Sequence, residues 1–224
     1  MIAILDYGAG NLRSVETGFA RAGVRAAVTS DPDTVLRADG VVLPGVGAFS
    51  DAMQALENSG LIPAIRTYAA SGRPFLGICL GMQALFAESE EGAGVKGLGL
   101  VPGTVRRLPD CGLKIPHMGW NSLKAAKASP LLEGLPEEPY AYFVHSYACQ
   151  AAEKADVLTI TEYGVPFHSA VQRGNILGVQ FHPEKSGATG RIMLKNFLRM
   201  AGEVTRRCTL SVSSPAWTSR MAVW

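Results

Sequence analysis

The sequence predicts an α/β fold, in which helices flank a central, mostly parallel sheet and antiparallel strands are added in the second half. In the first half, short apolar segments of strand length alternate with amphipathic helical segments. This alternation implies right-handed crossovers and parallel pairing. In the second half, strand-like segments follow one another with turns but no helices between them, a pattern typical of antiparallel pairing.

The first half of the chain alternates between strand and helix in regular order. Leu12, Val15 and Phe19 have helical spacing, and Gly23 is expected to end that helix because glycine readily adopts the left-handed C-terminal conformation. We expect strands at residues 2–6, 24–29, 40–43 and 75–78, and helices at residues 12–22, 49–56 and 61–70, with a short helix before residue 40.

The second half contains five strand-like segments separated by turn residues. After a glycine-rich loop, we expect strands at residues 101–108, 140–147, 157–163, 167–172 and 176–181. An amphipathic helix at residues 191–200 then closes a single domain that spans residues 1–203. Residues 204–224 carry three Arg, no acidic residue and no clear periodicity, so we expect a poorly ordered or loosely packed tail.

The composition argues against several functional classes. The chain has 224 residues and a formal net charge of +2, with 47% hydrophobic and 18% charged residues, as expected of a globular protein. No basic stretch interleaved with aromatics indicates a nucleic-acid partner, and no apolar run approaches the roughly 20 residues that span a membrane. The four cysteines form no Cys-x-x-Cys pair, so neither a metal site nor a disulfide framework is expected. We see no secretory signal and no nucleotide motif, and we expect a cytoplasmic location and no cofactor.

A cysteine between two glycines stands at the centre of this pattern. Gly77-Ile78-Cys79-Leu80-Gly81 has the order strand, sharp turn, helix of a nucleophile elbow. So tight a turn leaves no room for a Cβ on either side, and the helix N-terminus behind Cys79 favours its thiolate. We therefore predict a solvent-facing nucleophile that attacks a carbonyl carbon. The alternative is a chance pattern in which Cys79 is a small, buried apolar residue.

His182 and Glu184 are candidates for the base and for the group that orients it. They follow the strand at 176–181 in the segment His182-Pro183-Glu184. In extended backbone, residues two apart point to the same side, and Pro183 favours extended geometry for the residue before it. Glu184 is therefore expected to hold one imidazole nitrogen of His182 while the other faces Cys79. The alternative is an ordinary polar loop after a core strand.

Two backbone segments are candidates for an oxyanion hole, the site that stabilises charge developing on the attacked carbonyl. One is the amide of Leu80, directly after the cysteine. The other is the loop Pro44-Gly45-Val46-Gly47, which follows the strand at 40–43 and is rich enough in glycine to present an N–H group. An ordinary turn between a strand and a helix would also explain that loop.

Together these motifs resemble the class I, or triad, glutamine amidotransferases, and three more segments resemble the glutaminase subunits of imidazole glycerol phosphate synthase. The three are residues 6–12 (Asp-Tyr-Gly-Ala-Gly-Asn-Leu), 43–49 (Leu-Pro-Gly-Val-Gly-Ala-Phe) and 116–121 (Pro-His-Met-Gly-Trp-Asn), and residues 142–147 fit the same family. The resemblance runs from residue 2 to about residue 201, and the tail departs from it. It implies a flavodoxin-like form of the predicted fold.

The resemblance implies a glutaminase that works for a partner. Cys79 attacks the side-chain amide carbon of glutamine, His182 carries the proton to the leaving amine and then activates water, and Glu184 holds the imidazole. Gln83 and the backbone around Gly47 hold the substrate. The ammonia passes to a cyclase subunit, a (β/α)8 barrel that forms a heterodimer with this chain. That subunit makes imidazole glycerol phosphate and aminoimidazole carboxamide ribotide in histidine biosynthesis.

The resemblance also implies features that depend on the partner. The Val46 amide contributes to the oxyanion hole only after a partner-dependent rearrangement. The partner-facing residues are Met118, Trp120, Tyr142 and Lys185. Without the resemblance, Met118 and Trp120 would be interpreted as ordinary core residues.

The remaining candidates and functions are less favoured. His117, His145 and His168 are expected to be structural or peripheral, and Cys111 and Cys149 to be inert. One alternative function is a glutaminase that serves anthranilate, pyridoxal phosphate or guanylate synthesis, against which the Pro-His-Met-Gly-Trp-Asn segment argues. A catalytically idle binding protein is a second alternative, which the intact triad disfavours. A cysteine peptidase or γ-glutamyl hydrolase on the same fold is a third, which the partner-facing residues disfavour.

Overall fold

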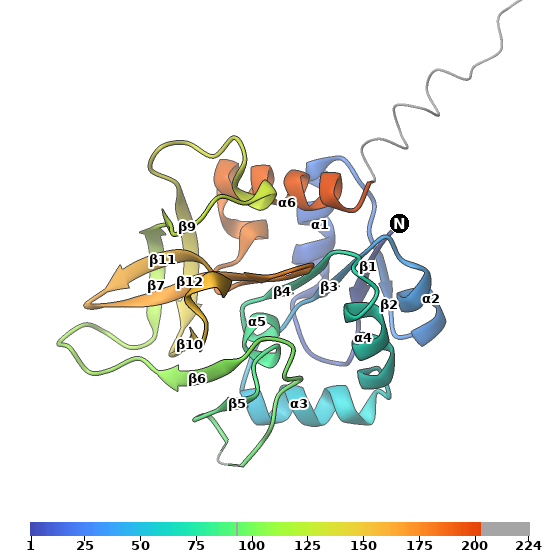
Figure 1. Ribbon diagram of the computed structural model, residues 1–224, viewed down its shortest axis with the longest axis horizontal. Helices are drawn as coiled ribbons and strands as arrows, with labels where there is room; N and C mark the ends of the chain where they lie inside the picture. The colour runs from blue at the N-terminus through green and yellow to red at the C-terminus, as the bar shows by residue number, and fades with distance from the viewer. Residues whose placement is uncertain (93, 203–224) are drawn as a thin grey trace, which may run out of the picture.

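The computed structural model describes residues 1–92 and 94–202, so the predicted tail at 204–224 lies outside the described residues. Within them, the strands form one large sheet and one small sheet (Figure 1). The large sheet contains β1 (Ile2–Leu5), β2 (Ala27–Thr29), β3 (Gly40–Leu43), β4 (Phe75–Ile78), β5 (Glu88–Ser89), β6 (Gly103–Arg107), β8 (Lys124–Ala125), β10 (Tyr147–Ala151), β11 (Val157–Tyr163), β12 (Val165–Arg173) and β13 (Ile176–Val179). The small sheet pairs β7 (His117–Ser122) with β9 (Tyr140–His145).

The parallel half of the sheet is confirmed. Its strands lie in the order β2-β1-β3-β4-β13, and each neighbouring pair is parallel. β13 comes from the C-terminal half of the chain, yet it pairs with β4 over its whole length, with Val179 opposite Ile78. The ends of β4 and β13 are therefore neighbours, although about a hundred residues of chain separate them.

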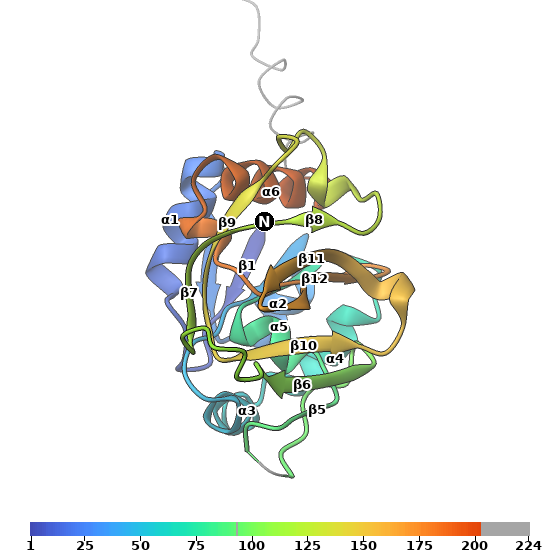
Figure 2. The same ribbon diagram turned by 90° about the vertical axis from the view of Figure 1, so that its left-hand side faces the viewer.

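Helices cover both faces of the parallel strands (Figures 1 and 2). Residues alternate along β1, so Ile2 and Ile4 belong to one apolar core and Ala3 and Leu5 to the other. α1 and α6 pack on the first face, and α3 and α4 on the second. The helices are α1 (Leu12–Ala22), α2 (Pro32–Arg37), α3 (Phe49–Asn58), α4 (Ile62–Ala69), α5 (Leu80–Ala84) and α6 (Gly187–Met200).

The helix boundaries follow local capping signals. α1 spans the predicted residues, because the Asn11 side chain accepts a hydrogen bond from the Ser14 amide and Gly23 ends the helix at φ 104°. α6 begins four residues before the predicted start, at Gly187 instead of residue 191. Apolar periodicity misses that first turn, because small residues occupy it.

The antiparallel half is confirmed in kind but differs in detail. β12 runs antiparallel to β13, and β10 runs antiparallel to both β12 and β6. The single strand predicted at 140–147 is wrong. The first strand, β9, ends at His145 in the small sheet, and the chain continues from Tyr147 as β10 in the large sheet. β7 was not predicted at all. Its inward-facing side chains include His117 and Asn121, which are polar and hide the alternation that marks a half-buried strand.

The carboxyl ends of the parallel strands meet at one edge of the sheet, where open α/β folds bind their ligands. The Pro44 loop follows β3, Cys79 follows β4, and His182 lies three residues after the end of β13. These strands are neighbours in the order β3-β4-β13. The predicted site residues therefore emerge side by side.

Candidate active site

Cys79 stands at the sharp turn between β4 and α5. Its backbone has φ 55° and ψ −109°, and it is the only non-glycine residue with a positive φ in the described part of the chain. Such a conformation costs of order 1–3 kcal/mol and persists only where the surroundings impose it. The strand-turn-helix order predicted for the elbow is confirmed.

The flanking glycines are required by close backbone contact. A Cβ at Gly81 would lie 1.9 Å from the carbonyl oxygen of Leu43 in β3, and a Cβ at Gly77 would lie 2.6 Å from the carbonyl oxygen of Gly81. Any side chain at either position would drive α5 away from the sheet. The predicted steric reason for the Gly-x-Cys-x-Gly pattern is therefore confirmed.

His182 and Glu184 form the predicted pair, but the predicted extended backbone between them is wrong. His182 itself is extended, whereas Pro183–Lys185 form a 3₁₀ turn, η3. His182 Nδ1 lies 2.8 Å from Glu184 Oε1, and both side chains are buried. Proline is favoured at the first position of such a turn, and the tight turn returns the carboxylate to the imidazole. The contact is as predicted, with a different local geometry.

Two glycines that the sequence pattern did not single out make room for Glu184. A Cβ at Gly18, in the middle of α1, would lie 2.8 Å from Glu184 Cβ. A Cβ at Gly190, in α6, would lie 1.8 Å from the carbonyl oxygen of Pro183. Glycine inside a helix costs about 1 kcal/mol relative to alanine, so both helices give up stability for close packing. In the sequence, a glycine inside an amphipathic helix was the one sign that these positions pack closely against another segment.

The charge on His182 reflects opposing influences. Burial is the largest of them and disfavours the imidazolium. Interactions with Cys79 and Glu184 together outweigh burial and raise the pKa of His182 to about 9. His182 Nε2 has no hydrogen-bond partner among the described residues. A protonated imidazole with one free N–H is suited to donate a proton to a leaving group.

A cavity of about 290 Å³ lies where the elbow meets His182. Cys79 lines it but is only 7% exposed, so the predicted solvent-facing position is wrong, and Cys79 forms part of the cavity wall instead. Glu184 lies behind His182 and does not line the cavity. The other cavity-lining residues named from the sequence are Val46, Gly47, Leu80 and Gln83. The volume is near the lower end of the ~300–1,000 Å³ range of small-molecule sites.

His145, expected to be structural or peripheral, also lines this cavity. The Tyr147 carbonyl can only accept, so the His145 Nδ1 that lies 2.9 Å from it carries the proton. His145 Nε2 then accepts from His117 Nδ1 at 3.0 Å. Burial lowers the pKa of His145 to about 3 and that of His117 to about 4. Both rings are therefore neutral near pH 7, and no local sequence signal places His145 in the cavity wall.

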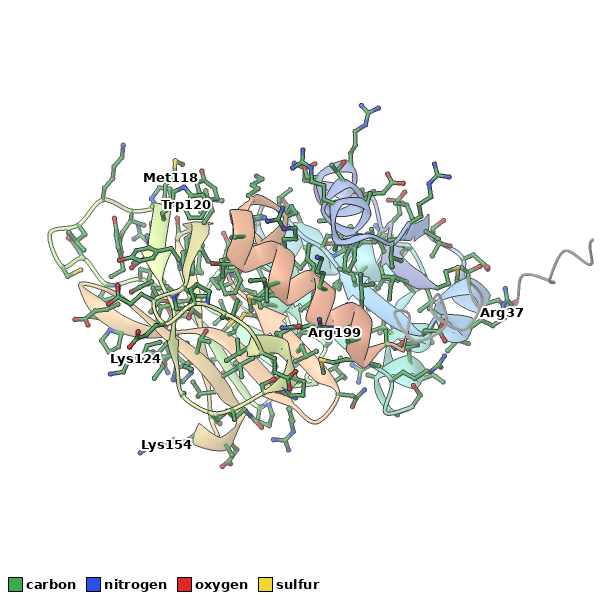
Figure 3. The ribbon with its side chains drawn as sticks, turned by 90° about the horizontal axis from the view of Figure 1, so that it is seen from above. Arg37, Met118, Trp120, Lys124, Lys154 and Arg199 are labelled. Carbon is green, nitrogen blue, oxygen red and sulfur yellow. The ribbon has the colours of Figure 1, made fainter. Side chains whose placement is uncertain are left out.

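The four residues predicted to face a partner share one region. Met118 and Trp120 are 63% and 56% exposed, so their interpretation as core residues is wrong (Figure 3). The Trp120 ring meets the Tyr142 ring edge to face, with centroids 6.2 Å apart. The Tyr142 carbonyl accepts a 2.9 Å hydrogen bond from the amide of His182, and Lys185 is exposed three residues further on. This surface is therefore hydrogen-bonded directly to the backbone of His182.

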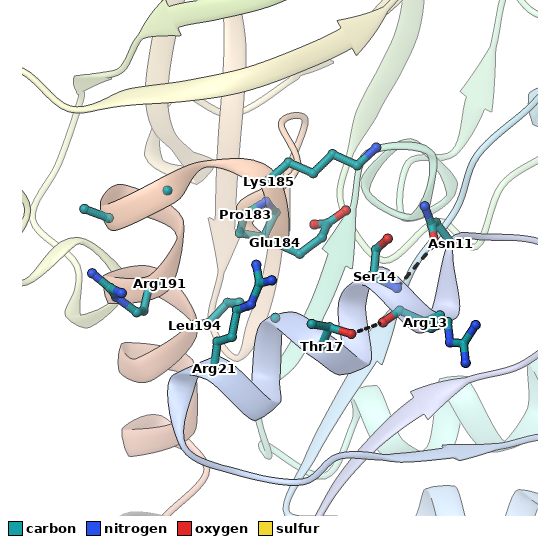
Figure 4. Close-up of a pocket in the computed structure, with 13 residues that line it drawn as sticks. Asn11, Arg13, Ser14, Thr17, Arg21, Pro183, Glu184, Lys185, Arg191 and Leu194 are labelled. Atoms are coloured by element: carbon teal, nitrogen blue, oxygen red, sulfur yellow. Dashed lines mark hydrogen bonds between the residues drawn. The ribbon is translucent and has the colours of Figure 1, made fainter.

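A groove of about 850 Å³ lies on the far side of Glu184, between α1 and α6 (Figure 4). It is lined by four basic side chains, from Arg13, Arg21, Lys185 and Arg191. Figure 4 shows the Lys185 side chain extending from η3 towards Asn11.

The structure also bears on metal and membrane binding. Within residues 1–92 and 94–202, no three His, Cys, Asp or Glu side chains are grouped so that they could hold a metal ion. Of the helices in the described part of the chain, none is long and apolar enough to cross a membrane.

Comparison with known proteins identifies relatives over nearly the whole described chain. The model of the family "Glutamine amidotransferase class-I" matches residues 3–201. The imidazole glycerol phosphate synthase subunit HisH of Desulfitobacterium hafniense is 53% identical over 203 residues, which cover 91% of this chain and 96% of that protein. HisH of Moorella thermoacetica is 52% identical over 205 residues, which cover 92% of this chain and 95% of that protein.

Solved structures show the same fold at lower identity. A crystal structure described as a glutamine amidotransferase has a TM-score of 0.70 at 20% identity and covers 90% of this chain and 98% of that one. PurLQS from Thermotoga maritima has a TM-score of 0.68 at 18% identity and covers 88% of this chain and 97% of that one. These likenesses establish the fold, and the family model and the relatives establish the kinship. The chain belongs to the class-I glutamine amidotransferase family and, within it, to the HisH subunits of imidazole glycerol phosphate synthase.

Proposed function

We propose that this protein is the glutaminase subunit of imidazole glycerol phosphate synthase, which hydrolyses glutamine in the cytoplasm and passes ammonia to a cyclase subunit for histidine biosynthesis. The observation that carries the proposal is that Cys79 and His182 line one cavity, while Glu184 holds the His182 imidazole from behind. The chain is 53% and 52% identical to two HisH subunits, and this similarity supports its assignment to histidine biosynthesis.

The reaction follows from the arrangement of the triad. The Cys79 thiolate attacks the side-chain carbonyl carbon of glutamine, and a C–S bond forms. The C–N bond then breaks as His182 Nε2 gives its proton to the leaving nitrogen, which departs as ammonia and leaves a thioester. His182 next takes a proton from water, whose oxygen attacks the thioester and releases glutamate. The Cys79 sulfur leaves as the C–S bond breaks. Glu184 keeps Nδ1 protonated and orients the ring throughout.

The cavity provides the groups that hold the substrate. Leu80 is the first residue of α5, where backbone N–H groups have no acceptor within the helix, so its amide is suited to the developing oxyanion. Val46 and Gly47 line the same cavity, and we assign the Val46 amide to the same oxyanion after rearrangement of its loop on partner docking. Gln83 uses its Nε2 for hydrogen bonds within the protein, so its Oε1 is the group left to bind glutamine.

The partner is proposed to dock on Met118, Trp120, Tyr142 and Lys185 as a heterodimer. An exposed Met–Trp pair is typical of a protein interface. Lys185 offers a cation for a carboxylate of the cyclase subunit, a (β/α)8 barrel in the family. Because the His182 amide bonds to the Tyr142 carbonyl, docking on this strand has a direct route to the catalytic histidine.

The proposal is tested by measuring ammonia release from glutamine, alone and with the cyclase subunit and its ligand. We expect weak activity alone and strong stimulation by the complex. Cys79→Ala should abolish ammonia release, while added ammonium still supports the cyclase. Cys111→Ala, at an exposed cysteine remote from the cavity, is the matched control and should keep activity. Full activity without a partner would refute the coupled function, and glutaminase activity in Cys79→Ala would refute the nucleophile.

A further inference from the structure

Gln180 connects the nucleophile to the buried polar groups around it. It follows β13, two residues before His182, and its side chain is fully buried. Gln180 Nε2 lies 3.7 Å from Cys79 Sγ, within hydrogen-bond distance for sulfur. Gln180 Oε1 lies 3.1 Å from Gln83 Nε2. One carboxamide therefore bridges Gln83 and the reacting sulfur.

The hydrogen bonds determine which end of this carboxamide faces the sulfur. The Tyr147 carbonyl can only accept, so Gln83 must direct its NH₂ group to it, at 3.0 Å. The same NH₂ group reaches Gln180, which must then offer its oxygen to Gln83. Its other end, the NH₂ group, is left to face Cys79. The Tyr147 carbonyl is itself held by His145, so the donor at the sulfur is fixed by a chain of buried contacts.

We propose that Gln180 is a further catalytic residue of this site, whose carboxamide donates a hydrogen bond to the Cys79 sulfur and stabilises the thiolate that attacks the substrate. A hydrogen bond to an ionised acceptor is stronger than one to its neutral form, so the contact favours thiolate over thiol. Because the donor is already fixed in place, no reorganisation is needed when the charge forms. The inference rests on the proposed glutaminase function, in which Cys79 is the nucleophile.

Other groups near the sulfur do not duplicate this role. Burial raises the pKa of Tyr7 and of Cys149, so both stay protonated and neutral near pH 7. His182 supplies the positive charge, and Gln180 supplies a neutral, fixed donor. Titratable groups face or influence Cys79 from several elements of the described chain: Tyr7 after β1, Glu91 after β5, His145 at the end of β9, Tyr147 and Cys149 in β10, and His182 after β13.

Alkylation by iodoacetamide tests this role without glutamine or a partner. The thiolate displaces iodide and forms a C–S bond, so the rate reports the thiolate population. Rates are measured for the Cys79 peptide by mass spectrometry from pH 5 to pH 10, with exposed Cys111 as the internal reference. The variants are Gln180→Met, which keeps the volume without a donor, and Gln180→Glu, which keeps the shape. Gln150→Met, at an exposed glutamine of β10, is the matched control.

We expect Gln180→Met to slow Cys79 alkylation about tenfold on the acid side of the profile, and to move the midpoint up by about one pH unit. Gln180→Glu should shift it further, because a carboxylate repels the thiolate. Gln150→Met and the Cys111 rate should be unchanged. An unchanged Cys79 profile in either folded Gln180 variant overturns the proposal, as does an equal shift in Gln150→Met. If Gln180→Met fails to fold, the profile of Gln180→Glu tests the proposal. That variant keeps an oxygen that accepts the hydrogen bond from Gln83, so it is expected to fold. A shifted profile in a chain with no glutaminase activity refutes only the proposed function.

Discussion

Gly18→Ala is expected to impair catalysis from behind the triad, at a position that touches neither the nucleophile nor the substrate cavity. The added Cβ would lie 2.8 Å from Glu184 Cβ and 3.2 Å from Leu194 Cδ1. Carbon atoms normally approach to about 3.5 Å, so α1 and η3 must separate by roughly 0.7 Å. The separation moves Glu184, whose carboxylate orients His182.

The expected magnitudes differ for stability and for activity. Alanine improves the propensity of α1 by about 1 kcal/mol, while overpacking costs about 1–3 kcal/mol, so the net loss is about 0–2 kcal/mol and the variant folds. A displacement of about 1 Å in a catalytic arrangement can cost about a hundredfold in rate. For the smaller shift at Glu184 we expect kcat for glutamine hydrolysis to fall at least about tenfold.

The assay measures ammonia released from glutamine in the complex with the cyclase, together with thermal unfolding and the NMR titration of His182. Glu16→Ala, on an exposed position of the same helix, is the matched control and should leave all three unchanged. Activity supported by added ammonium should be retained in Gly18→Ala. Wild-type kcat in Gly18→Ala, with a normal His182 titration, would refute the reasoning that close packing of α1 positions Glu184.

Three further predictions concern pH and the partner surface. First, the folded state holds a proton on His182 up to a pKa of about 9, against 6.5 unfolded, so this stabilisation is complete below pH 6.5 and is lost as pH rises through 9. The free energy of unfolding in urea should fall between pH 6 and pH 10 in the wild type, and His182→Gln should remove this pH dependence. An equal pH dependence in both proteins would contradict the prediction. Second, the lowered pKa values of His145 and His117, about 3 and about 4, act in the opposite window. Their contribution is present above pH 6.5 and is lost as pH falls through 4 and 3, so His145→Gln should flatten the acid limb of urea unfolding measured from pH 3 to pH 7. Third, Trp120→Ala should raise the Kd for the cyclase at least about tenfold with unchanged thermal stability, because exposed aromatic residues carry interface energy. The Kd is measured by titration calorimetry, with Val28→Ala, at an exposed residue of β2, as the control variant. An equal rise of the Kd in Val28→Ala would rule out a specific docking role for Trp120.

The sequence by itself determined the parts of the protein that depend on neighbours along the chain. The alternation of apolar strands and amphipathic helices predicted the parallel half, with β3 and β4 at the predicted residues. The elbow at Cys79 and the pairing of His182 with Glu184 were also predicted, because each depends on spacings of two residues. The 3₁₀ turn at η3 was missed, yet the contact survived because two residues remain within reach in either geometry.

Only the tertiary structure decided which distant groups surround the triad. Gly18 meets Glu184, and Gln180 meets Cys79, across more than a hundred residues of chain. His145 lines the cavity because the chain leaves one sheet and enters another directly after it. No local period records such contacts, since they arise when β13 inserts beside β4 and brings the second half of the chain to the elbow. The elbow that presents Cys79 is a local property of this sequence, whereas the groups that surround Cys79 are brought together by the packing of the sheet.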